Sequence, residues 1–536
     1  MNIALRIQEM ARRHPQKKSV IFSQRVGERY RYPSYTFAEF EERSNQMANT
    51  FVSLGITPGM RTLLFVKPCL DFSVITFALF KVGAVPVLID PGMGLKNLLS
   101  SVEQVRPEAL VSIGKVHWVR RFLVKPFRSV NINVSLDPVG GKTCYLYENL
   151  ASAGREFSPV DRKSEDVSAI LFTSGGTGIP KGVLYTHGIL NAQTDALREM
   201  FSLDETQVDL PGFPLFALFT LAMGMSSVIP DLDPTRPAQC DPAKLVRNIL
   251  DQQVSFVAGS PAIWERVGAY CLVKNIQLGS VKQVVMFGAP VRAELHRTFK
   301  KILPFGDTFT PYGATECLPV SLIRGTDVLQ KHLPKTLQGM GTCVGKAVPG
   351  VEIKIIFVTD IPESELREVP SGEVGEIVVS GRQVTPGYFE MDQETKKAKI
   401  THAGKLWHRM GDLGWMDEEK NLWFLGRKGH RVETREETFY PLQIEAIFNQ
   451  HKDIKRSALV KIRAGNEVGL ALVIERHDRK TRMDPKFLSD LEGLKRKTRP
   501  AERVSHFFLH PSFPVDVRHN IKIDRTKLSH WAQLRL

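Results

Sequence analysis

Ten consecutive residues, Thr173 to Gly182, combine three hydroxyl side chains, four glycines and one lysine in the sequence TSGGTGIPKG. They directly follow the apolar run Ser168 to Phe172, which is typical of a short buried strand. Glycines let the backbone turn sharply and bring its N–H groups against phosphate oxygens. The hydroxyl groups add donors and Lys181 adds a cation. The segment therefore predicts a triphosphate-binding loop, and a plain flexible turn is the alternative.

This loop is not the P-loop of kinases and GTPases. Pro180 precedes Lys181 and Gly182 follows it, whereas a P-loop has Gly before the lysine and Ser or Thr after it. The loop instead resembles the phosphate loop of the adenylate-forming superfamily, which holds acyl-CoA synthetases, luciferases and peptide-synthetase adenylation domains. The resemblance implies ATP and Mg²⁺ as cofactors and Lys181 as a catalytic cation. It implies a phosphate-binding set of Thr173, Ser174, Gly175, Gly176, Thr177 and Gly178.

Two further family motifs follow in order. FGAPV at Phe287 to Val291 resembles the segment whose backbone lines the adenine, which implies a role for Gly288, Ala289 and Pro290. YGATE at Tyr312 to Glu316 resembles the next motif. By that resemblance Tyr312 stacks on adenine beside Gly313, Thr315 touches phosphate, and Glu316 is a catalytic residue that holds the magnesium ion.

The last three motifs lie in the final quarter of the chain. HRMGDLG at His408 to Gly414 resembles the strand-turn whose aspartate, here Asp412, takes both ribose hydroxyls, and two acceptor oxygens suit a vicinal diol. GRK at Gly426 to Lys428 resembles the entrance to the family's hinge, with Arg427 on the ribose or a phosphate. NIKIDR at Asn520 to Arg525 resembles the closing motif, with Lys522 as the catalytic lysine.

The elements that must position these residues follow an α/β rhythm. Short apolar runs bounded by turn-forming residues alternate with longer amphipathic stretches, and loops at such strand ends usually build the site of an open sheet. The expected strands include Thr62 to Val66, Val85 to Ile89, Ser168 to Phe172, Ser255 to Ala258, Gln283 to Phe287, Glu376 to Ser380 and Leu422 to Leu425. The resemblance spans about Thr36 to Leu528. We expect a large multi-layered α/β N-terminal domain at residues 1–428 and a small mobile α+β C-terminal domain at 429–536.

Composition limits the function classes. A chain of 536 residues with 43% hydrophobic and 24% charged residues is typical of a globular protein of at least two domains. Charges interrupt every apolar stretch before the roughly 20 residues of a membrane span, and the N-terminus has no signal-peptide core. Six scattered cysteines fit a reducing, cytoplasmic location. The net charge of +15 favours anionic partners and leaves peripheral membrane contact open, but no nucleic-acid motif is present.

Two departures from the family pattern concern the acceptor of the acyl group. Glu436 stands where acyl-CoA synthetases have a glycine beside the pantetheine path, and Ala217, in FPLFALF at Phe213 to Phe219, stands where CoA ligases commonly have histidine. With the segment Ile229 to Pro242, these departures most resemble the branch of olefin β-lactone synthetases. That branch adenylates a long-chain 2-alkyl-3-hydroxy fatty acid and closes a β-lactone with its own hydroxyl, releasing AMP and pyrophosphate. Association with other enzymes of that pathway is left open. A long-chain acyl-CoA or acyl-ACP ligase and a non-catalytic nucleotide-binding scaffold remain alternatives.

Overall fold

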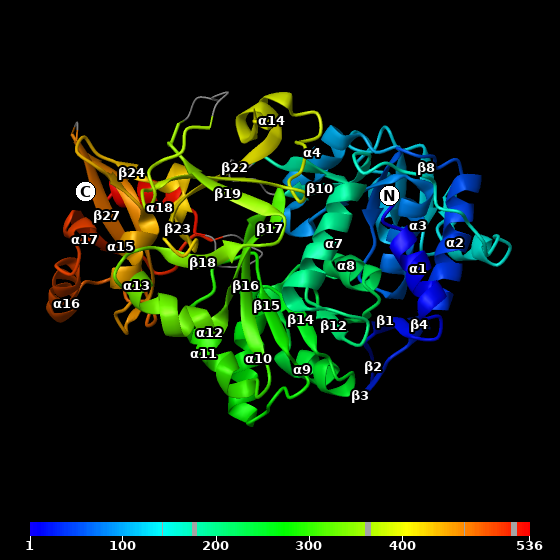
Figure 1. The fold of residues 1–536 in the computed structure, drawn as a ribbon, viewed down its shortest axis with the longest axis horizontal. Helices are drawn as coiled ribbons and strands as arrows, with labels where there is room; N and C mark the ends of the chain where they lie inside the picture. Colours follow the sequence, from blue (N-terminus) through cyan, green and yellow to red (C-terminus); the bar gives the residue numbers. More distant parts are fainter. Residues whose placement is uncertain (142, 174–178, 360–365, 466, 516–522) are drawn as a thin grey trace.

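The structure is a computed structural model that describes residues 1–141, 143–173, 179–359, 366–465, 467–515 and 523–536. Its centre is a 14-stranded sheet (Figure 1). From one edge to the other, the strands are β19 (Val351–Ile356), β20 (Gly375–Gly381), β22 (Lys405–Met416), β23 (Leu422–Arg427), β18 (Thr342–Ala347), β17 (Cys317–Arg324), β16 (Asp307–Ala314), β15 (Gln283–Met286), β14 (Phe256–Gly259), β12 (Val208–Pro211), β13 (Ser226–Ile229), β1 (Lys18–Phe22) and β4 (Ser34–Thr36), and β21 (Lys399–His402) pairs with β22.

A second sheet of seven strands carries the predicted phosphate loop. Its order is β11 (Lys181–Thr186), β10 (Val167–Thr173), β6 (Val85–Ile89), β5 (Arg61–Phe65), β7 (Ala109–Ser112), β8 (Ile132–Ser135) and β9 (Cys144–Tyr145). All neighbours are parallel except β10 and β11, which form an antiparallel pair. Each strand expected from the sequence is present, with bounds that differ by at most two residues, and the α/β fold class is confirmed.

Helices pack on and between these sheets: α1 (Leu5–Arg13), α2 (Phe37–Ser53), α3 (Leu70–Val82), α4 (Leu95–Val105), α5 (Gly114–Val119), α6 (Leu146–Leu150), α7 (His187–Phe201), α8 (Ala217–Ala222), α9 (Pro242–Asp251), α10 (Pro261–Lys274), α11 (Ala293–Ile302), α12 (Gly325–Asp327), α13 (Leu333–Leu337) and α14 (Asp392–Ala398). Local sequence sets their ends. The Thr36 hydroxyl accepts a hydrogen bond from the Glu39 N–H while the Glu39 carboxylate accepts one from the Thr36 N–H, so α2 begins with a capping box. Among the described residues, no helix has the length and apolar character needed to cross a bilayer.

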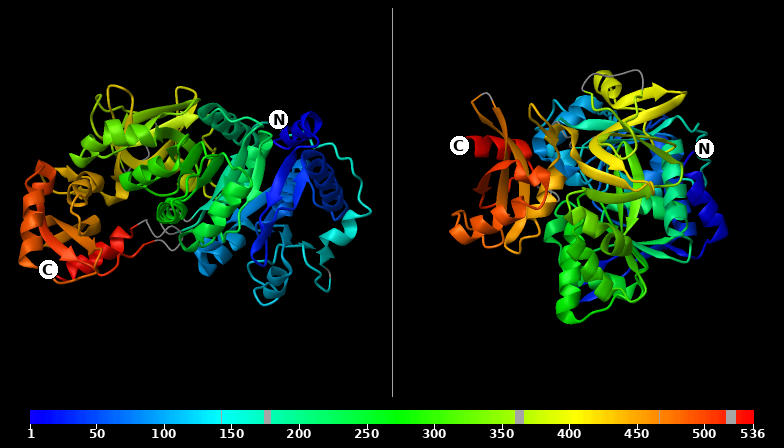
Figure 2. Two further views of the ribbon diagram at one scale, coloured as in Figure 1. Left: turned by 90° about the horizontal axis from the view of Figure 1, so that it is seen from below. Right: turned by 60° about the vertical axis from the view of Figure 1, so that its left-hand side comes forward.

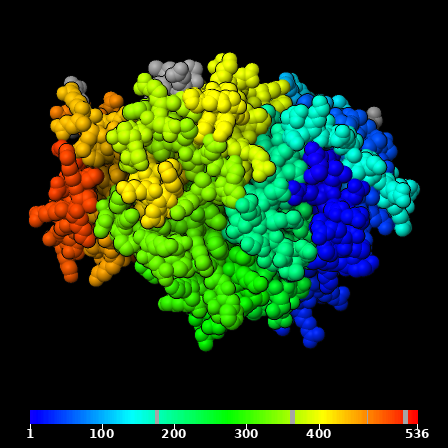
Figure 3. Space-filling model, viewed as in Figure 1, coloured from blue at the N-terminus to red at the C-terminus, as the bar shows by residue number. Residues whose placement is uncertain are grey.

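The C-terminal residues form a sheet of their own, β26 (Ile454–Ala464), β27 (Glu467–Arg476) and β28 (Val504–Leu509), covered by α15 (Pro441–Phe448), α16 (Pro485–Lys495), α17 (Arg499–Glu502) and α18 (Arg525–Gln533). Two small hairpins, β2 (Gln24–Val26) with β3 (Arg29–Arg31) and β24 (Val432–Glu433) with β25 (Thr438–Phe439), complete the strands. The C-terminal sheet lies at the opposite end of the molecule from α1 and α2 (Figure 1). On the face drawn in Figure 3, atoms of the C-terminal residues adjoin those of the preceding part of the chain. Gln450 bridges the two parts, because its Nε2 donates to the Leu337 carbonyl at 2.8 Å.

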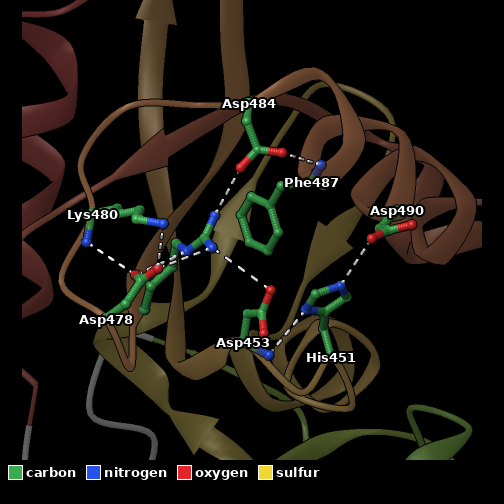
Figure 4. A network of polar contacts seen from close by, with 8 residues as sticks. His451, Asp453, Asp478, Lys480, Asp484, Phe487 and Asp490 are labelled. Atoms are coloured by element: carbon green, nitrogen blue, oxygen red, sulfur yellow. Dashed lines mark hydrogen bonds and ion pairs between the residues drawn. The ribbon is translucent and has the colours of Figure 1, made fainter.

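A buried arginine holds one corner of this C-terminal sheet. Arg476 is 5% exposed and lies within 3.2 to 3.6 Å of carboxylate oxygens of Asp453, Asp478 and Asp484. Its guanidinium also covers the Phe487 ring at 4.3 Å. Figure 4 shows the three carboxylates converging from separate segments of the chain. Three carboxylates around a cation that is always charged offset the cost of its burial.

Candidate active site

The predicted motifs converge on one cavity of about 3410 Å³ between the two large sheets and the C-terminal residues. Lys181, the loop Phe287–Val291, the turn Tyr312–Glu316, Asp412 and Arg427 all line it. These segments are far apart in the sequence. The loop Phe287–Val291 follows β15, the turn Tyr312–Glu316 and Arg427 end strands, Lys181 begins β11, and Asp412 lies inside β22. The structure therefore brings together the described members of the predicted site, most of them at strand ends.

Lys181 opens β11 directly opposite the end of β10, where it pairs with Thr173. Its ammonium forms an ion pair with Glu394 at 2.7 Å and lies 5.0 Å from the centre of the Tyr388 ring. Ser174, Gly175, Gly176, Thr177 and Gly178 lie outside the described residues. The Lys181 ammonium thus lies at the cavity, paired with a carboxylate from α14. A bound phosphate can replace that carboxylate as its partner.

The turn that carries Thr315 and Glu316 joins β16 to β17 and is fixed from three sides. The Tyr185 hydroxyl donates to the Thr315 carbonyl at 2.8 Å, and the Thr385 N–H donates to the Glu316 carbonyl at 2.9 Å. The Tyr388 hydroxyl donates to Glu316 Oε1 at 2.7 Å. Burial and, next, the Glu316 carboxylate raise the pKa of Tyr388, so this hydroxyl keeps its proton and its role as donor.

Gly313 sits in this hairpin where no side chain would fit. A Cβ placed there would lie 2.7 Å from the Cys317 carbonyl oxygen, closer than carbon and oxygen pack. The glycine lets the turn fold tightly, and the result is that the Glu316 carboxylate is presented at the cavity.

Lys399 supports the site without lining the cavity, and sequence reasoning missed it. It lies on β21, and its Nζ donates to Thr385 Oγ1 at 3.3 Å. Burial lowers the pKa of Lys399 to about 8, while the charge of Glu316 opposes that shift. Tyr185, Tyr388 and Glu394 were missed as well. A lone tyrosine, lysine or glutamate has no spacing that separates it from ordinary surface or core residues.

Asp412, Tyr312 and Arg427 form a compact polar group. The Tyr312 hydroxyl donates to Asp412 Oδ2 at 2.7 Å, and Arg427 Nη1 lies 3.0 Å from Asp412 Oδ1. Asp412 and Arg427 face each other in register across β22 and β23. Burial raises the pKa of Asp412, and the Arg427 charge opposes this.

One oxygen of this group lacks a hydrogen bond. Asp412 Oδ1 is buried and accepts none from the described residues, although it lies near the Arg427 charge. A buried acceptor without a donor is costly, so the site fits a ligand that brings hydroxyl donors. A ribose diol is such a ligand.

The predicted adenine segment forms the loop between β15 and α11. Gly288 has φ +87°, a left-handed conformation that glycine adopts without strain, and Ala289 and Pro290 follow it along the cavity. The Phe287 N–H donates to the Gly259 carbonyl at 3.1 Å, which anchors the loop on β14. The Phe287 ring lies 4.4 Å from the Phe216 ring, so this loop adjoins the FPLFALF segment.

The FPLFALF segment lines the cavity with all of its residues except Ala217. Ala217 begins α8 and is fully buried in the hydrophobic core beside Leu221. Ala217, which stands where CoA ligases commonly have histidine, therefore packs in the core. Its neighbours Phe216, Leu218 and Phe219 form the apolar wall of the cavity. An apolar wall of this kind suits a hydrocarbon chain.

The structure describes the predicted hinge entrance, Gly426 to Lys428, and describes the closing motif only from residue 523 onward. Lys428 Nζ lies 3.2 Å from Glu376, so this cation already has a carboxylate partner, and Gly429 lies in a short 3₁₀ turn, Lys428–His430. Lys522 lies outside the described residues, but Asp524 and Arg525 of the same motif line the cavity. Glu436 is exposed and pairs with Arg503 at 3.0 Å, on the outside of the cavity.

A divalent ion could be held here only with help from a ligand. Within the part of the chain that the structure describes, no three His, Cys, Asp or Glu side chains cluster as a metal cage would require. Glu316 contributes a single carboxylate. Mg²⁺ is commonly bound by one or two carboxylates together with substrate phosphates, and Glu316 fits that arrangement.

Comparisons with known proteins agree with this geometry. The family model described as AMP-binding enzyme matches residues 7–389. The chain is 39% identical to the olefin beta-lactone synthetase of Stenotrophomonas maltophilia over 100% of this chain and 98% of that protein. It is 40% identical to the olefin beta-lactone synthetase of Xanthomonas campestris pv. campestris over 93% and 90%. Its fold is similar to that of the amide bond synthetase McbA from Marinactinospora thermotolerans, with a TM-score of 0.80, 21% identity and 99% of each chain covered.

Proposed function

The chain belongs to the AMP-binding enzyme family, and from this premise we propose that it converts a long-chain 2-alkyl-3-hydroxy fatty acid into a β-lactone. Family membership makes it an ATP-dependent ligase that forms an acyl-adenylate with ATP and Mg²⁺. The hydroxy acid and the lactone are the proposal.

In the first step the acid carboxylate attacks the α-phosphorus of ATP. A bond forms between the carboxylate oxygen and phosphorus, and the bond to pyrophosphate breaks. We propose that Asp412, Tyr312 and Arg427 hold the ribose and orient the nucleotide, and that Lys181 leaves Glu394 to balance phosphate charge together with Lys522. Such catalysis is mainly positioning and electrostatic stabilisation.

Glu316 would hold Mg²⁺, which supplies charge neutralisation on the phosphates when it is bound. Tyr388 supports this role, because its hydroxyl occupies Oε1 and so fixes the carboxylate. Lys399 lies behind the same carboxylate and partly balances its charge before any ligand is present.

In the second step the 3-hydroxyl oxygen attacks the acyl carbon. The carbon–oxygen bond to AMP breaks, AMP leaves and the hydroxyl proton is lost to the surroundings. Well-oriented intramolecular attack can reach effective molarities on the order of 10⁵ M or more, which offsets part of the strain of a four-membered ring. We also propose that the chain divides into domains 1–428 and 429–536, which reorient between the steps. This is supported by the separate hydrophobic clusters of the C-terminal sheet.

The main support for a lactone product is the 39% identity, along the whole chain, to an olefin beta-lactone synthetase. The test is to incubate the enzyme with ATP, Mg²⁺ and a 2-alkyl-3-hydroxy acid, with and without CoA, and to identify products by mass spectrometry. We expect AMP and a product lighter than the acid by one water, without CoA. A thioester that forms only with CoA, and no dehydrated product, would instead identify an acyl-CoA ligase.

A matched substrate isolates the second step. The same acid without its 3-hydroxyl should be adenylated and then stall, which would give a burst of pyrophosphate equal to the enzyme concentration. Continuous turnover of this acid would contradict the internal nucleophile, and no pyrophosphate with either acid would contradict adenylation of this substrate class.

A further inference from the structure

An exposed apolar cluster lies on α5 and the turns that follow it, residues 114–128, which we call the 114–128 segment. Trp118 is 58% exposed, Phe122 is 72% exposed and Val124 is 65% exposed. The Trp118 and Phe122 rings meet at 5.1 Å in an edge-on arrangement. The chain around residue 120, light blue, lies at the lower edge of the left-hand view in Figure 2. Large apolar side chains grouped in water usually mark an interaction surface.

The exposed side chains are not needed to hold this segment on the protein. Its other face supplies Val116, Leu123 and Phe127, which pack into the hydrophobic cluster of the seven-stranded sheet. Phe127 is only 6% exposed. The segment is thus amphipathic, with one face serving the fold and the other facing solvent.

The same segment is strongly basic. It contains no acidic residue and five cations: Lys115, Arg120, Arg121, Lys125 and Arg128. Lys125 pairs with Glu103 of α4 at 3.1 Å, while neither Lys115 nor Arg128 has an ion pair among the described residues. Aromatic side chains flanked by cations suit a surface that is apolar inside and anionic outside.

The cluster also adjoins the cavity. Val116, Val119, Arg120 and Leu123 line it from the 114–128 segment, and Leu98 lines it from the facing helix α4. Leu95, which is 66% exposed at the start of α4, and the exposed Lys115 also line the cavity. The exposed aromatic rings therefore belong to a segment that itself forms part of the cavity wall.

We propose that the 114–128 segment docks the enzyme on an anionic phospholipid membrane. Trp118, Phe122 and Val124 enter the interfacial layer while the cations bind lipid phosphates. Charge complementarity selects this occupant, because the segment carries five cations and no acidic residue beside the exposed rings, and lipid phosphates are anionic. The further idea that docking delivers a long-chain acid to the cavity rests on the proposed function. The docking itself does not.

Tryptophan fluorescence tests the insertion directly on the full chain. Trp118 is the only exposed tryptophan of the six, since the other five are buried or partly buried. Vesicles of phosphatidylcholine with about one third phosphatidylglycerol should shift the emission to the blue. The shift should be absent in Trp118→Phe, which keeps an aromatic ring. An equal shift in Trp118→Phe would place any insertion elsewhere and overturn the proposal.

Vesicle sedimentation measures the affinity and separates the two contributions. Because each cation near an anionic surface contributes about a fivefold gain, Arg121→Glu with Arg128→Glu, neither of which lines the cavity, should weaken binding by about thirtyfold or more. Trp118→Ser with Phe122→Ser should weaken it by about tenfold or more. Matched controls are Phe305→Ser with Val273→Ser, both 82% exposed elsewhere, and Lys300→Glu with Lys301→Glu. These controls should bind like the wild type.

Three results would overturn the proposal. The first is no binding to phosphatidylglycerol vesicles at low salt. The second is binding to pure phosphatidylcholine vesicles that equals binding to the anionic vesicles. The third is weakening of vesicle binding by the control variants that equals the weakening by the variants of the 114–128 segment. Self-association that only the Trp118→Ser, Phe122→Ser variant abolishes, without vesicle binding, would assign the surface to a second copy of the chain. Adenylation of a short, water-soluble acid should be unchanged in all variants. Failure of the lactone chemistry would leave the vesicle result intact, so the two proposals fail separately.

Discussion

Replacing Asp412 by asparagine should weaken ATP binding by about 10-fold to 150-fold. Asparagine keeps the shape but exchanges one acceptor oxygen for an amide that can only donate. In the structure Oδ2 already accepts from Tyr312, and Oδ1 is the buried acceptor without a hydrogen bond. A lost hydrogen bond to a charged group costs about 1.5 to 3 kcal/mol, and every 1.4 kcal/mol is tenfold in affinity.

Calorimetric titration with ATP and with 2′,3′-dideoxy-ATP makes this a double-mutant cycle. The wild type should discriminate against the dideoxy nucleotide by about the factor lost in Asp412→Asn, and the variant should bind both nucleotides almost equally. Tyr312→Phe is the control, because it removes only the donor to Oδ2. It should preserve the discrimination.

The pH dependence gives a second check on the same carboxyl. Since burial raises the pKa of Asp412, the group takes up its proton at a higher pH than an exposed aspartate and then loses an acceptor. ATP affinity should therefore fall earlier on acidification than affinity for the dideoxy nucleotide. If Asp412→Asn weakened both nucleotides equally, the ribose assignment would be wrong and the residue would serve only to hold Arg427.

Three further predictions concern lysines of the site. Lys522→Ala should block adenylation yet keep most of the second step when a preformed acyl-adenylate is supplied, and equal loss of both steps would refute its assignment. Glu394→Gln should tighten ATP binding a few-fold, because Lys181 no longer has to leave a carboxylate at 2.7 Å. The control Lys397→Met, which removes the other cation paired with Glu394, should not tighten it. Titration with ATP measures both. Burial lowers the pKa of Lys399 to about 8 from 10.5, so the folded chain loses a proton that the unfolded chain keeps. Wild-type stability in urea should consequently rise between these pH values, a rise that Lys399→Met should lack.

The fold and the nucleotide motifs were predictable because their signals are local. The strand Val85–Ile89 is an apolar run closed by turn residues, and it has the expected bounds. Asp412 and Arg427 are fifteen residues apart on consecutive strands, so a hairpin brings them together. The roles of these residues toward ATP stay predictions.

The residues that support the site were not predictable, because their signals are long-range. Tyr388 reaches Glu316 across 72 positions, and Glu394 reaches Lys181 across 213. No periodicity connects such pairs. Ala217 illustrates the converse: the FPLFALF motif alone does not separate an apolar channel from core packing. In the structure the Ala217 methyl group at the start of α8 packs into the core, while its larger neighbours line the cavity.

Arg476 has a mechanical consequence for the C-terminal sheet. Its three carboxylates come from the turn before β26, the turn after β27 and the first residue before α16, so one side chain clamps three separate stretches of chain. Because Arg476 holds these stretches together, they resist sliding past one another, and we expect this part of the protein to move as one rigid unit. We propose that any bending between this part and residues 1–428 occurs at the short turn around Gly429, where an added side chain would meet no neighbour within 4 Å.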